Sequence, residues 1–505
     1  MGRRCRIFSR SSTLKNQIYN VIKPYLLLLP FCLGVFLGAD DQTKVVTILP
    51  QIMIDFEIPI TSLDTASWLI VIYLIGYTAV MPFTGRLSDK FGFRNLFIIS
   101  LIIFLIGSVL TALSPEISKI FHREPNVNWI LATRFIQSIG GGALVPISIA
   151  AAGFLVPRNK LPIAYGLIGA SAEAGAVFGP LVGGALTEFL SWEWAFWINL
   201  PPTILIIIAV IIWIPKSTFR DLKIDYLGSI IFFLFIATLS LACAQITKSN
   251  ELLIIFAVIS FATLIGGIFL YKASKEFIIP KQIIKNKLFM LANLTHFFIG
   301  ITLIIAIITV PVMAETILGA SPLEAGLRLL RLTIALSIGA FLGGVLTQRL
   351  GARIPLILGF VLIAIGFYFM FGWDLKLADP SMTIHLAISG LGFGLCISPI
   401  TDTAMKEIKD SDRGSASALL TVSRMLGMTI GLSSLTAWGT TRFAKFTSGL
   451  EGFSLDPIAQ KKMTDASLNA GLDVFQEFFL IGLLVTLVAV PLSLAITLKK
   501  NKGDR

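Results

Sequence analysis

Three ionisable side chains interrupt the apolar stretch "GVFLGADDQTKVVTILPQI" at residues 34–52. They are Asp40, Asp41 and Lys44, and on a helix the lysine can reach either carboxylate, three or four residues earlier. Charges inside a bilayer are costly unless they are paired or hydrated. Two interpretations stay open: a local ion pair that neutralises itself, or a carboxylate that binds and releases a proton as a transport site alternates between two sides.

Three further charges fall inside apolar runs, at Arg134, Glu173 and Arg424. Glu173 has no basic residue within one helical turn, so as a lone carboxylate it is the better candidate for proton exchange; the alternative is a satisfied interhelical hydrogen bond. Arginine stays charged in proteins, so Arg134 and Arg424 require partners on other helices. We hypothesise that Arg424 competes with the proton for Asp41 or Glu173, the alternative being a fixed salt bridge.

The elements that hold these charges are membrane spans. The chain has 505 residues, of which 55% are hydrophobic and 14% charged, and its mean hydropathy is +0.85. A soluble protein carries roughly 25% charged residues. Apolar runs of about 20 residues recur along the chain, enough for a helix to cross a bilayer. The pattern predicts an all-α polytopic membrane protein with fourteen transmembrane helices.

Basic residues orient the predicted spans. Residues 1–23 carry six Lys and Arg side chains, and alternate loops on the same side hold most of the remainder of the 41. The positive-inside rule therefore places both termini in the cytoplasm, in an integral plasma (inner) membrane protein with an uncleaved first helix. Basic loops facing anionic lipid also account for the net charge of +12, so no nucleic-acid partner is indicated.

An internal repeat divides the chain. "GRLSDKFGFRN" at 85–95 returns as "GVLTQRLGARI" at 344–354, with Gln348 where the first copy has Asp89. Repeated bundles around a midplane site are typical of transporters. The expected parts are a cytoplasmic basic tail (1–23), a six-helix bundle (24–214), a linker with two extra spans (215–287), a second six-helix bundle (288–498) and a cytoplasmic tail (499–505).

Motifs for other chemistry are missing from the sequence. It has no GxxxxGK[ST] loop for ATP, no HExxH, three isolated histidines and four scattered cysteines without a CxxC pair. We therefore predict no metal, no cofactor and no enzyme activity, which leaves secondary transport.

Two stretches carry a family resemblance. "GRLSDKFGFRN" resembles the cytoplasmic loop signature of the major facilitator superfamily, in which Gly85 and Gly92 would permit a tight turn, Asp89 would cap a helix N-terminus and Arg94 completes the pattern. "RFIQSIGGG" (134–142) is similar to the fourth-helix motif of that superfamily, with Arg134 as its buried cation.

The fifth span resembles the signature of proton-coupled exporters, G-x8-G-x3-G-P-x2-G-G. Small residues let helices approach closely and a proline bends a helix, although ordinary small-residue packing is the alternative. The residues that fit the pattern are Gly166, Gly175, Gly179, Pro180, Gly183 and Gly184.

Other segments narrow the resemblance. "WEWAFWINLP" and "DYLG" are similar to the fourteen-helix drug:proton antiporter branch, and "VVTILPQIM", "YLIGYTAVMP", "SRMLGM" and "LTAWGTTRF" resemble its mycobacterial triacylglyceride exporters. The resemblance implies functional charges at Asp41, Glu173 and Arg424. Lys44 departs from the family pattern and leaves Asp41 in doubt as the sole proton carrier. The long outside loop 442–473 matches the outward helix extensions of those exporters, which work with an extracytoplasmic lipoprotein.

These features predict a proton-coupled secondary exporter of lipophilic compounds. Its partners would be a lipophilic small molecule or lipid, protons, the bilayer and an extracytoplasmic lipoprotein. Neutral lipid such as triacylglyceride is slightly favoured as substrate. The alternatives are a multidrug:proton antiporter and a metabolite or organic-anion transporter that uses the in-span cations.

Overall fold

The computed structural model describes residues 24–56, 63–122, 126–216, 222, 224–246, 249–273, 278–448 and 457–498. Every regular element in these ranges is a helix, and 14 helices are long and apolar enough to cross a membrane. The predicted all-α membrane fold with fourteen spans is confirmed. The predicted tails, 1–23 and 499–505, lie outside the described residues.

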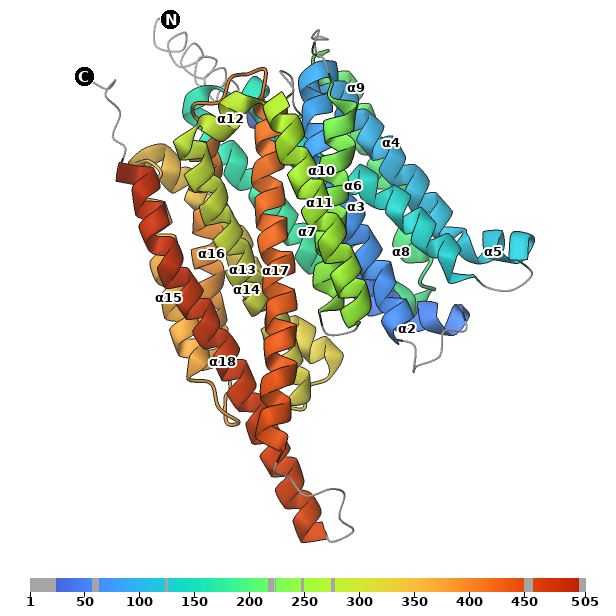
Figure 1. Ribbon diagram of the computed structural model, residues 1–505, viewed down its shortest axis with the longest axis vertical. Coiled ribbons are helices and arrows are strands. Elements are labelled where there is room, and N and C mark those ends of the chain that lie inside the picture. The colour runs from blue at the N-terminus through green and yellow to red at the C-terminus, as the bar shows by residue number, and fades with distance from the viewer. Residues whose placement is uncertain are drawn as a thin grey trace, which may run out of the picture.

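We group the helices along the chain into a first half, a linker and a second half, following the division predicted from the sequence repeat (Figure 1). The spans of the first half are α2 (Leu29–Asp55), α3 (Leu63–Phe91), α4 (Phe93–Ala112), α6 (Val127–Leu155), α7 (Leu161–Phe189) and α9 (Leu200–Trp213). Short helices α5 (Ser114–His122) and α8 (Trp194–Trp197) lie between them. The linker contains α10 (Tyr226–Gln245), α11 (Asn250–Ala273) and α12 (Lys281–Lys285). The second half contains α13 (Lys287–Thr316), α14 (Pro322–Leu350), α15 (Arg353–Phe371), α16 (Ser381–Met405), α17 (Arg413–Thr447) and α18 (Pro457–Leu498).

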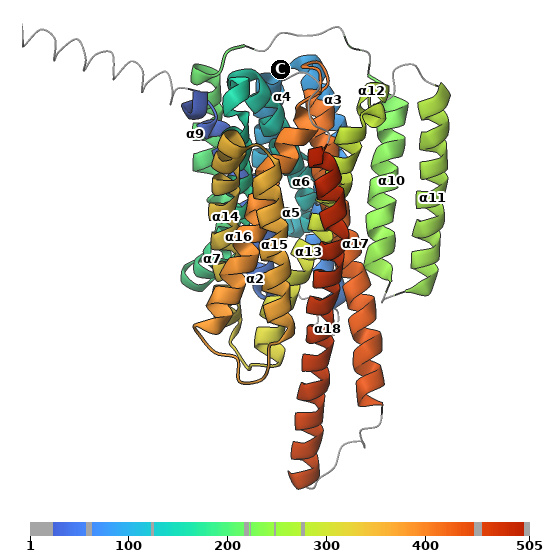
Figure 2. The ribbon, with the colours of Figure 1, turned by 90° about the vertical axis from the view of Figure 1, so that its left-hand side faces the viewer.

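The described chain begins and finishes at the same end of the bundle, the upper end in Figure 1. We call this the terminal end and the opposite one the distal end. The linker helix α10 packs against α3 and α17, while α11 lies outside it and contacts α10 (Figure 2).

The two copies of the repeat form equivalent helix–turn–helix corners at the terminal end. Gly92 separates α3 from α4 with φ 83°, and Gly351 follows α14 with φ 78°. Both lie in the left-handed region that favours glycine. Gly85 does not form part of the turn, contrary to the prediction, because it lies inside α3. A Cβ at this position would come within 2.4 Å of the Gly414 carbonyl oxygen on α17, so its small size permits contact between the halves.

The last two spans extend far beyond the others at the distal end (Figure 2). Helix α17 has 35 residues and α18 has 42, which correspond to about 52 and 63 Å of helix against a hydrocarbon core of about 30 Å. Arg442 on α17 pairs with Glu477 on α18, which also accepts a hydrogen bond from Trp438 Nε1 at 2.8 Å. The predicted loop 442–473 is therefore helical at 442–447 and 457–473, and residues 449–456 lie outside the described chain.

Candidate functional site

A buried polar cluster in the first half is centred on Asp41. Arg134 Nη1 on α6 donates to Asp41 Oδ2 at 2.7 Å, and Gln137 Nε2 donates to Asp41 Oδ1 at 3.0 Å. Asn199, which precedes α9, donates to the same Oδ1 at 2.8 Å. The Arg134 guanidinium also lies 4.1 Å from the centroid of the Tyr73 ring. Helix α6 and the start of α9 thus supply three donors to one carboxylate whose side chain is 0% exposed.

Lys44 extends this cluster along α2. Its Nζ lies 2.7 Å from Asp40 Oδ2 and 3.7 Å from Asp41 Oδ1, so it does reach both carboxylates as the spacing predicts. It also donates to the Ala195 carbonyl at 3.0 Å and to Asn199 Oδ1 at 2.9 Å. The side chain of Asp40 is 7% exposed while that of Lys44 is 0% exposed. Three donated contacts fix the ammonium group within the first half.

Glycines of the exporter pattern bring α7 onto the segment of α2 that carries these charges. A Cβ on Gly175 would lie 2.2 Å from the Phe36 carbonyl oxygen, and one on Gly179 would lie 2.4 Å from that of Asp40. A Cβ on Gly183 would lie 2.7 Å from the Lys44 carbonyl oxygen. These three residues, spaced four apart, form one face of α7, and only hydrogen fits there.

The other members of the pattern have different surroundings. Gly166 faces the second half, where a Cβ would lie 2.5 Å from the Ala340 carbonyl oxygen of α14. Pro180 lies inside α7. Gly184 has open space within 4 Å of its would-be Cβ, so close packing does not explain it.

Glu173 and Arg424 join the two halves. Arg424 Nη1 on α17 donates to Glu173 Oε1 on α7 at 2.8 Å, and the side chains are 11% and 8% exposed. Glu173 is therefore not a lone carboxylate. Its partner is Arg424, 251 residues away; of the two carboxylates that the sequence offered to Arg424, Asp41 and Glu173, the structure pairs it with Glu173. Each residue lies about 17 Å along its helix from the terminal end, near the middle of a bilayer.

Asp89 forms a second contact between the halves, at the terminal end. Its Oδ1 accepts from the Gly414 backbone N–H at 2.7 Å, and its Oδ2 accepts from the Ser415 N–H at 3.0 Å and hydroxyl at 2.7 Å. These N–H groups open α17, so Asp89 caps a helix N-terminus as predicted, and it does so across the interface. Arg94 stays within the first half and donates to the Ile211 carbonyl at 2.8 Å.

The second copy of the repeat makes a weaker contact between the halves. Gln348 donates to the Asn159 carbonyl at 2.8 Å, a neutral hydrogen bond in place of the charged cap. Ser398 adds a hydrogen bond of 2.6 Å to the Pro162 carbonyl. The polar contacts between the halves thus gather at the terminal end and, through Glu173 and Arg424, at mid-depth.

Sequence reasoning missed Gln137 and Asn199. Gln137 follows Arg134 by three residues and so shares its helix face, a signal the sequence contained. Asn199 stands in "WINLP" near Trp197 and could have been noted as a polar side chain inside a span. Its contacts with Asp41 and Lys44, however, depend on how α9 packs against α2.

A family model described as Major Facilitator Superfamily matches residues 31–432 and 292–499. The chain belongs to the major facilitator superfamily.

Among the residues that the structure describes, no group of three or more His, Cys, Asp and Glu side chains could hold a metal ion.

Curated relatives place the chain more finely within the superfamily. It is 33% identical over 435 residues to a triacylglyceride transporter of Mycolicibacterium hassiacum, covering 82% of this chain and 79% of the relative. A probable triacylglyceride transporter of Mycobacterium leprae is 31% identical over 503 residues, covering 94% and 96%. The triacylglyceride transporter of Mycobacterium tuberculosis is also 31% identical, covering 94% of each chain.

Solved structures agree on the fold. A proton:xylose symporter of the superfamily superposes with a TM-score of 0.60 at 16% identity, covering 92% of this chain and 95% of the symporter. A human organic anion transporter gives 0.59 at 14% identity, covering 92% and 99%. With the 14 spans, these findings make the protein an integral membrane transporter of the major facilitator superfamily and not an enzyme.

Proposed function

We propose that the protein is a proton-coupled exporter of lipophilic compounds in the plasma membrane, with both termini in the cytoplasm. The observation that carries this proposal is the ion pair between Glu173 and Arg424, because it joins the two halves near the middle of the bilayer. A transporter alternates by moving one half against the other, so a bond between the halves must break and re-form in each cycle.

Protonation of Glu173 supplies the trigger for breaking that bond. A neutral carboxyl group loses most of its attraction for the guanidinium of Arg424, which cannot give up its own charge. The proton and Arg424 therefore compete for the Glu173 carboxylate. Each proton moving inward contributes about 2.3 kcal/mol per 100 mV of membrane potential, a driving force available to outward transport.

The charges in the first half have a different role in this proposal. Asp41 pairs with Arg134, and Lys44 bonds Ala195 and Asn199, all within that half. These contacts hold the first half together as a rigid body, which carries Glu173 and against which Arg424 moves with the second half. Asp89 closes the terminal end by capping α17, and the proton on Glu173 would favour the state in which this end opens.

Neutral lipid such as triacylglyceride is the substrate class that we favour, because the curated relatives covering nearly the whole chain are named triacylglyceride transporters. Export of small amphiphilic drugs by the same proton exchange is the second candidate. A metabolite or organic-anion transporter is less well supported. The cations from which we predicted that use, Lys44, Arg134 and Arg424, each contact a carboxylate of the chain itself.

The extension of α17 and α18 fits delivery of lipid to an extracytoplasmic lipoprotein. Helices of this length extend well beyond the hydrocarbon core. The ion pair of Arg442 and Glu477 links α17 to α18. A lipoprotein outside the membrane could bind this extension and receive the lipid directly, so that the lipid would not have to cross water.

The test is transport by the reconstituted protein. Proteoliposomes with an imposed pH gradient should move fluorescent triacylglyceride out of the donor membrane, and Arg424→Ala should abolish this movement while the protein stays folded and abundant. Arg349→Gln, which removes an exposed cation at the end of α14, is the control and should transport normally. Unchanged transport by Arg424→Ala would rule out the proton exchange, and transport of an amphiphilic dye but not of lipid would favour the drug exporter.

A further inference from the structure

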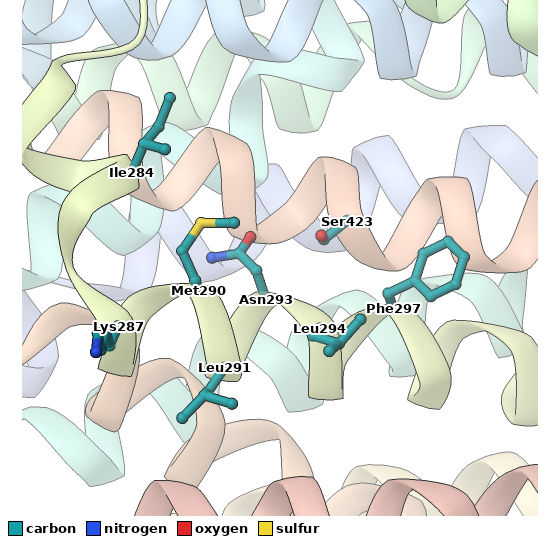
Figure 3. Close-up of a pocket in the computed structure, with 8 residues that line it drawn as sticks. All are labelled: Ile284, Lys287, Met290, Leu291, Asn293, Leu294, Phe297 and Ser423. Carbon is teal, nitrogen blue, oxygen red and sulfur yellow. The ribbon is translucent and has the colours of Figure 1, made fainter.

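A groove runs along the terminal half of α13, beside α17. Its volume is about 640 Å³, and Figure 3 shows side chains of α13 lining it together with Ile284 and Ser423. This volume is typical of small-ligand sites, which span about 300–1,000 Å³. Met290 and Leu294 are 43% and 42% exposed, so the groove opens on the side of the helix bundle instead of ending in its core.

The depth of the groove matches one leaflet of a bilayer. Its lining runs from Lys287, the first residue of α13, to Phe297. This part of the helix rises about 15 Å, half of the roughly 30 Å hydrocarbon core. A molecule lying in the groove would extend from the interface at the terminal end to the middle of the membrane.

Positive charge gathers at the mouth of the groove. Lys287 lines the groove and is exposed, and α12 adds Lys281 and Lys285 just before it. Glu407 is the acid placed beside them, where it accepts a hydrogen bond of 3.2 Å from Asn286. The cluster therefore keeps an excess of positive charge, which attracts anionic headgroups at a membrane surface.

Asn293 places a polar atom inside the otherwise apolar part of the groove. The residue is 5% exposed; its Nδ2 donates to the Phe289 carbonyl at 2.9 Å, while its buried Oδ1 has no hydrogen-bond partner. Side chains on a helix lean toward its N-terminus, so this acceptor lies between the mouth and the apolar floor. Buried acceptors are nearly always satisfied, and an occupant of the groove could supply the missing donor.

We propose that this groove binds one anionic glycerophospholipid from the leaflet at the terminal end. Its phosphate meets Lys287, and a water molecule held by its glycerol ester groups donates a hydrogen bond to Asn293 Oδ1. One acyl chain lies along Met290, Leu294 and Phe297. The site is separate from the transport pair, because it opens to the bilayer on the outer side of α13, and it would bind lipid whether or not the protein exports lipid.

The first experiment measures lipid retained by the full-length protein. Native mass spectrometry in mild detergent would follow titration with phosphatidylglycerol or phosphatidylcholine of identical chains. Wild type should bind the anionic lipid more tightly. Lys287→Gln should weaken that binding about fivefold and leave phosphatidylcholine unaffected, as expected for one basic residue at an anionic headgroup. Arg349→Gln, which removes a cation at the same end of the bundle, should have no effect. Equal affinity of wild type for both lipids, or equal losses in the two variants, would overturn the proposal.

A second pair of variants tests the groove itself. Leu294→Trp should fill it and remove the tightest phosphatidylglycerol site. Leu484→Trp, at a position on α18 that is 53% exposed, should leave that site intact. Thermal unfolding in detergent checks that both variants fold. Full retention of the tight site in folded Leu294→Trp would contradict the assignment, and if that variant does not fold, the comparison of Lys287→Gln with Arg349→Gln decides alone.

Discussion

Two buried charge clusters, one around Asp41 and one at Glu173, are built on different plans. Three side chains donate to Asp41, and all of them come from the first half. Among the described residues Glu173 has one such donor, and it comes from the second half. The Asp41 side chain is fully enclosed, whereas Glu173 and Arg424 keep 8% and 11% of their side-chain surface exposed.

The difference separates two kinds of charge cluster. We call the Asp41 cluster, held within one half, the scaffold, and the Glu173–Arg424 pair, shared between the halves, the switch. A carboxylate with several donors inside one rigid body gains nothing from a change in how the halves are arranged. A carboxylate whose single charged donor sits on the other half changes its surroundings whenever the halves move. Under the proposed function, only the second arrangement links a proton to transport, so we propose that the exchange occurs at Glu173 and that Asp41 has a structural role.

The largest effect should come from breaking the Asp41 cluster. Arg134→Leu leaves the buried Asp41 carboxylate without the cation that bonds it directly, and Lys44 Nζ, 3.7 Å away, is then the nearest positive charge. Removing one partner of a buried ion pair costs about 3–5 kcal/mol. We expect a large loss of thermal stability in detergent, measured by the temperature of unfolding. Adding Asp41→Asn to Arg134→Leu should recover part of that loss, since the unpaired charge is gone. Normal stability of the single variant would show that the cluster is not a scaffold.

The packing of α7 on α2 offers a matched pair of smaller changes. Gly179→Ala places a methyl group against the Asp40 carbonyl oxygen at 2.4 Å, whereas Gly184→Ala meets nothing within 4 Å. Overpacking costs about 1–3 kcal/mol, while alanine in an open helical position is favoured over glycine by up to about 1 kcal/mol. The temperature of unfolding should fall for Gly179→Ala, and it should stay unchanged or rise for Gly184→Ala. Equal behaviour would mean that the glycine face does not fix the Asp41 cluster.

The sequence predicted the spans, the repeat and the charged residues, because bilayer length and hydropathy act locally. Pairing of Lys44 with the two aspartates followed from helical spacing alone. The partners of Glu173 and Arg134 did not, since they depend on contacts between segments far apart in the chain. Gly85 was misread as a turn residue because a glycine that allows helices to touch looks the same in sequence as one that allows a turn.

Asp89 tests whether closing the terminal end is a separate event from the switch. Asp89→Asn keeps one acceptor oxygen and loses the negative charge that caps α17, worth about 1 kcal/mol. The equilibrium constant between the closed and the open terminal end should fall about fivefold, measured as distances between spin labels on the terminal ends of α3 and α17. Gln348→Ala removes a neutral bond and should shift these distances less. A larger shift for Gln348→Ala would contradict the unequal roles of the two repeats.

The exposed ion pair of Arg331 with Asp379 should contribute less to stability than either buried cluster. A hydrogen bond from the Thr383 hydroxyl, together with Arg331, lowers the pKa of Asp379, which lies in an exposed loop. Because the folded-state pKa is the lower one, this stabilisation is present above the unfolded value of about 3.9 and is lost as pH falls through the folded value. Asp379→Asn should therefore destabilise by only a few tenths of a kcal/mol at pH 7 and flatten the acid limb of a stability–pH profile. A loss as large as that of Arg134→Leu would erase the distinction between exposed and buried pairs.

Proton flux in proteoliposomes containing Glu173→Gln tests whether Glu173 carries the transported proton. A pH-sensitive dye inside the vesicles would report substrate-dependent proton movement for wild type, Glu173→Gln and Asp41→Asn, at equal amounts of folded protein. The account predicts that Glu173→Gln abolishes proton movement while Asp41→Asn, corrected for its lower stability, retains it. Coupled proton movement that persists in Glu173→Gln and disappears in Asp41→Asn would reverse the assignment of switch and scaffold.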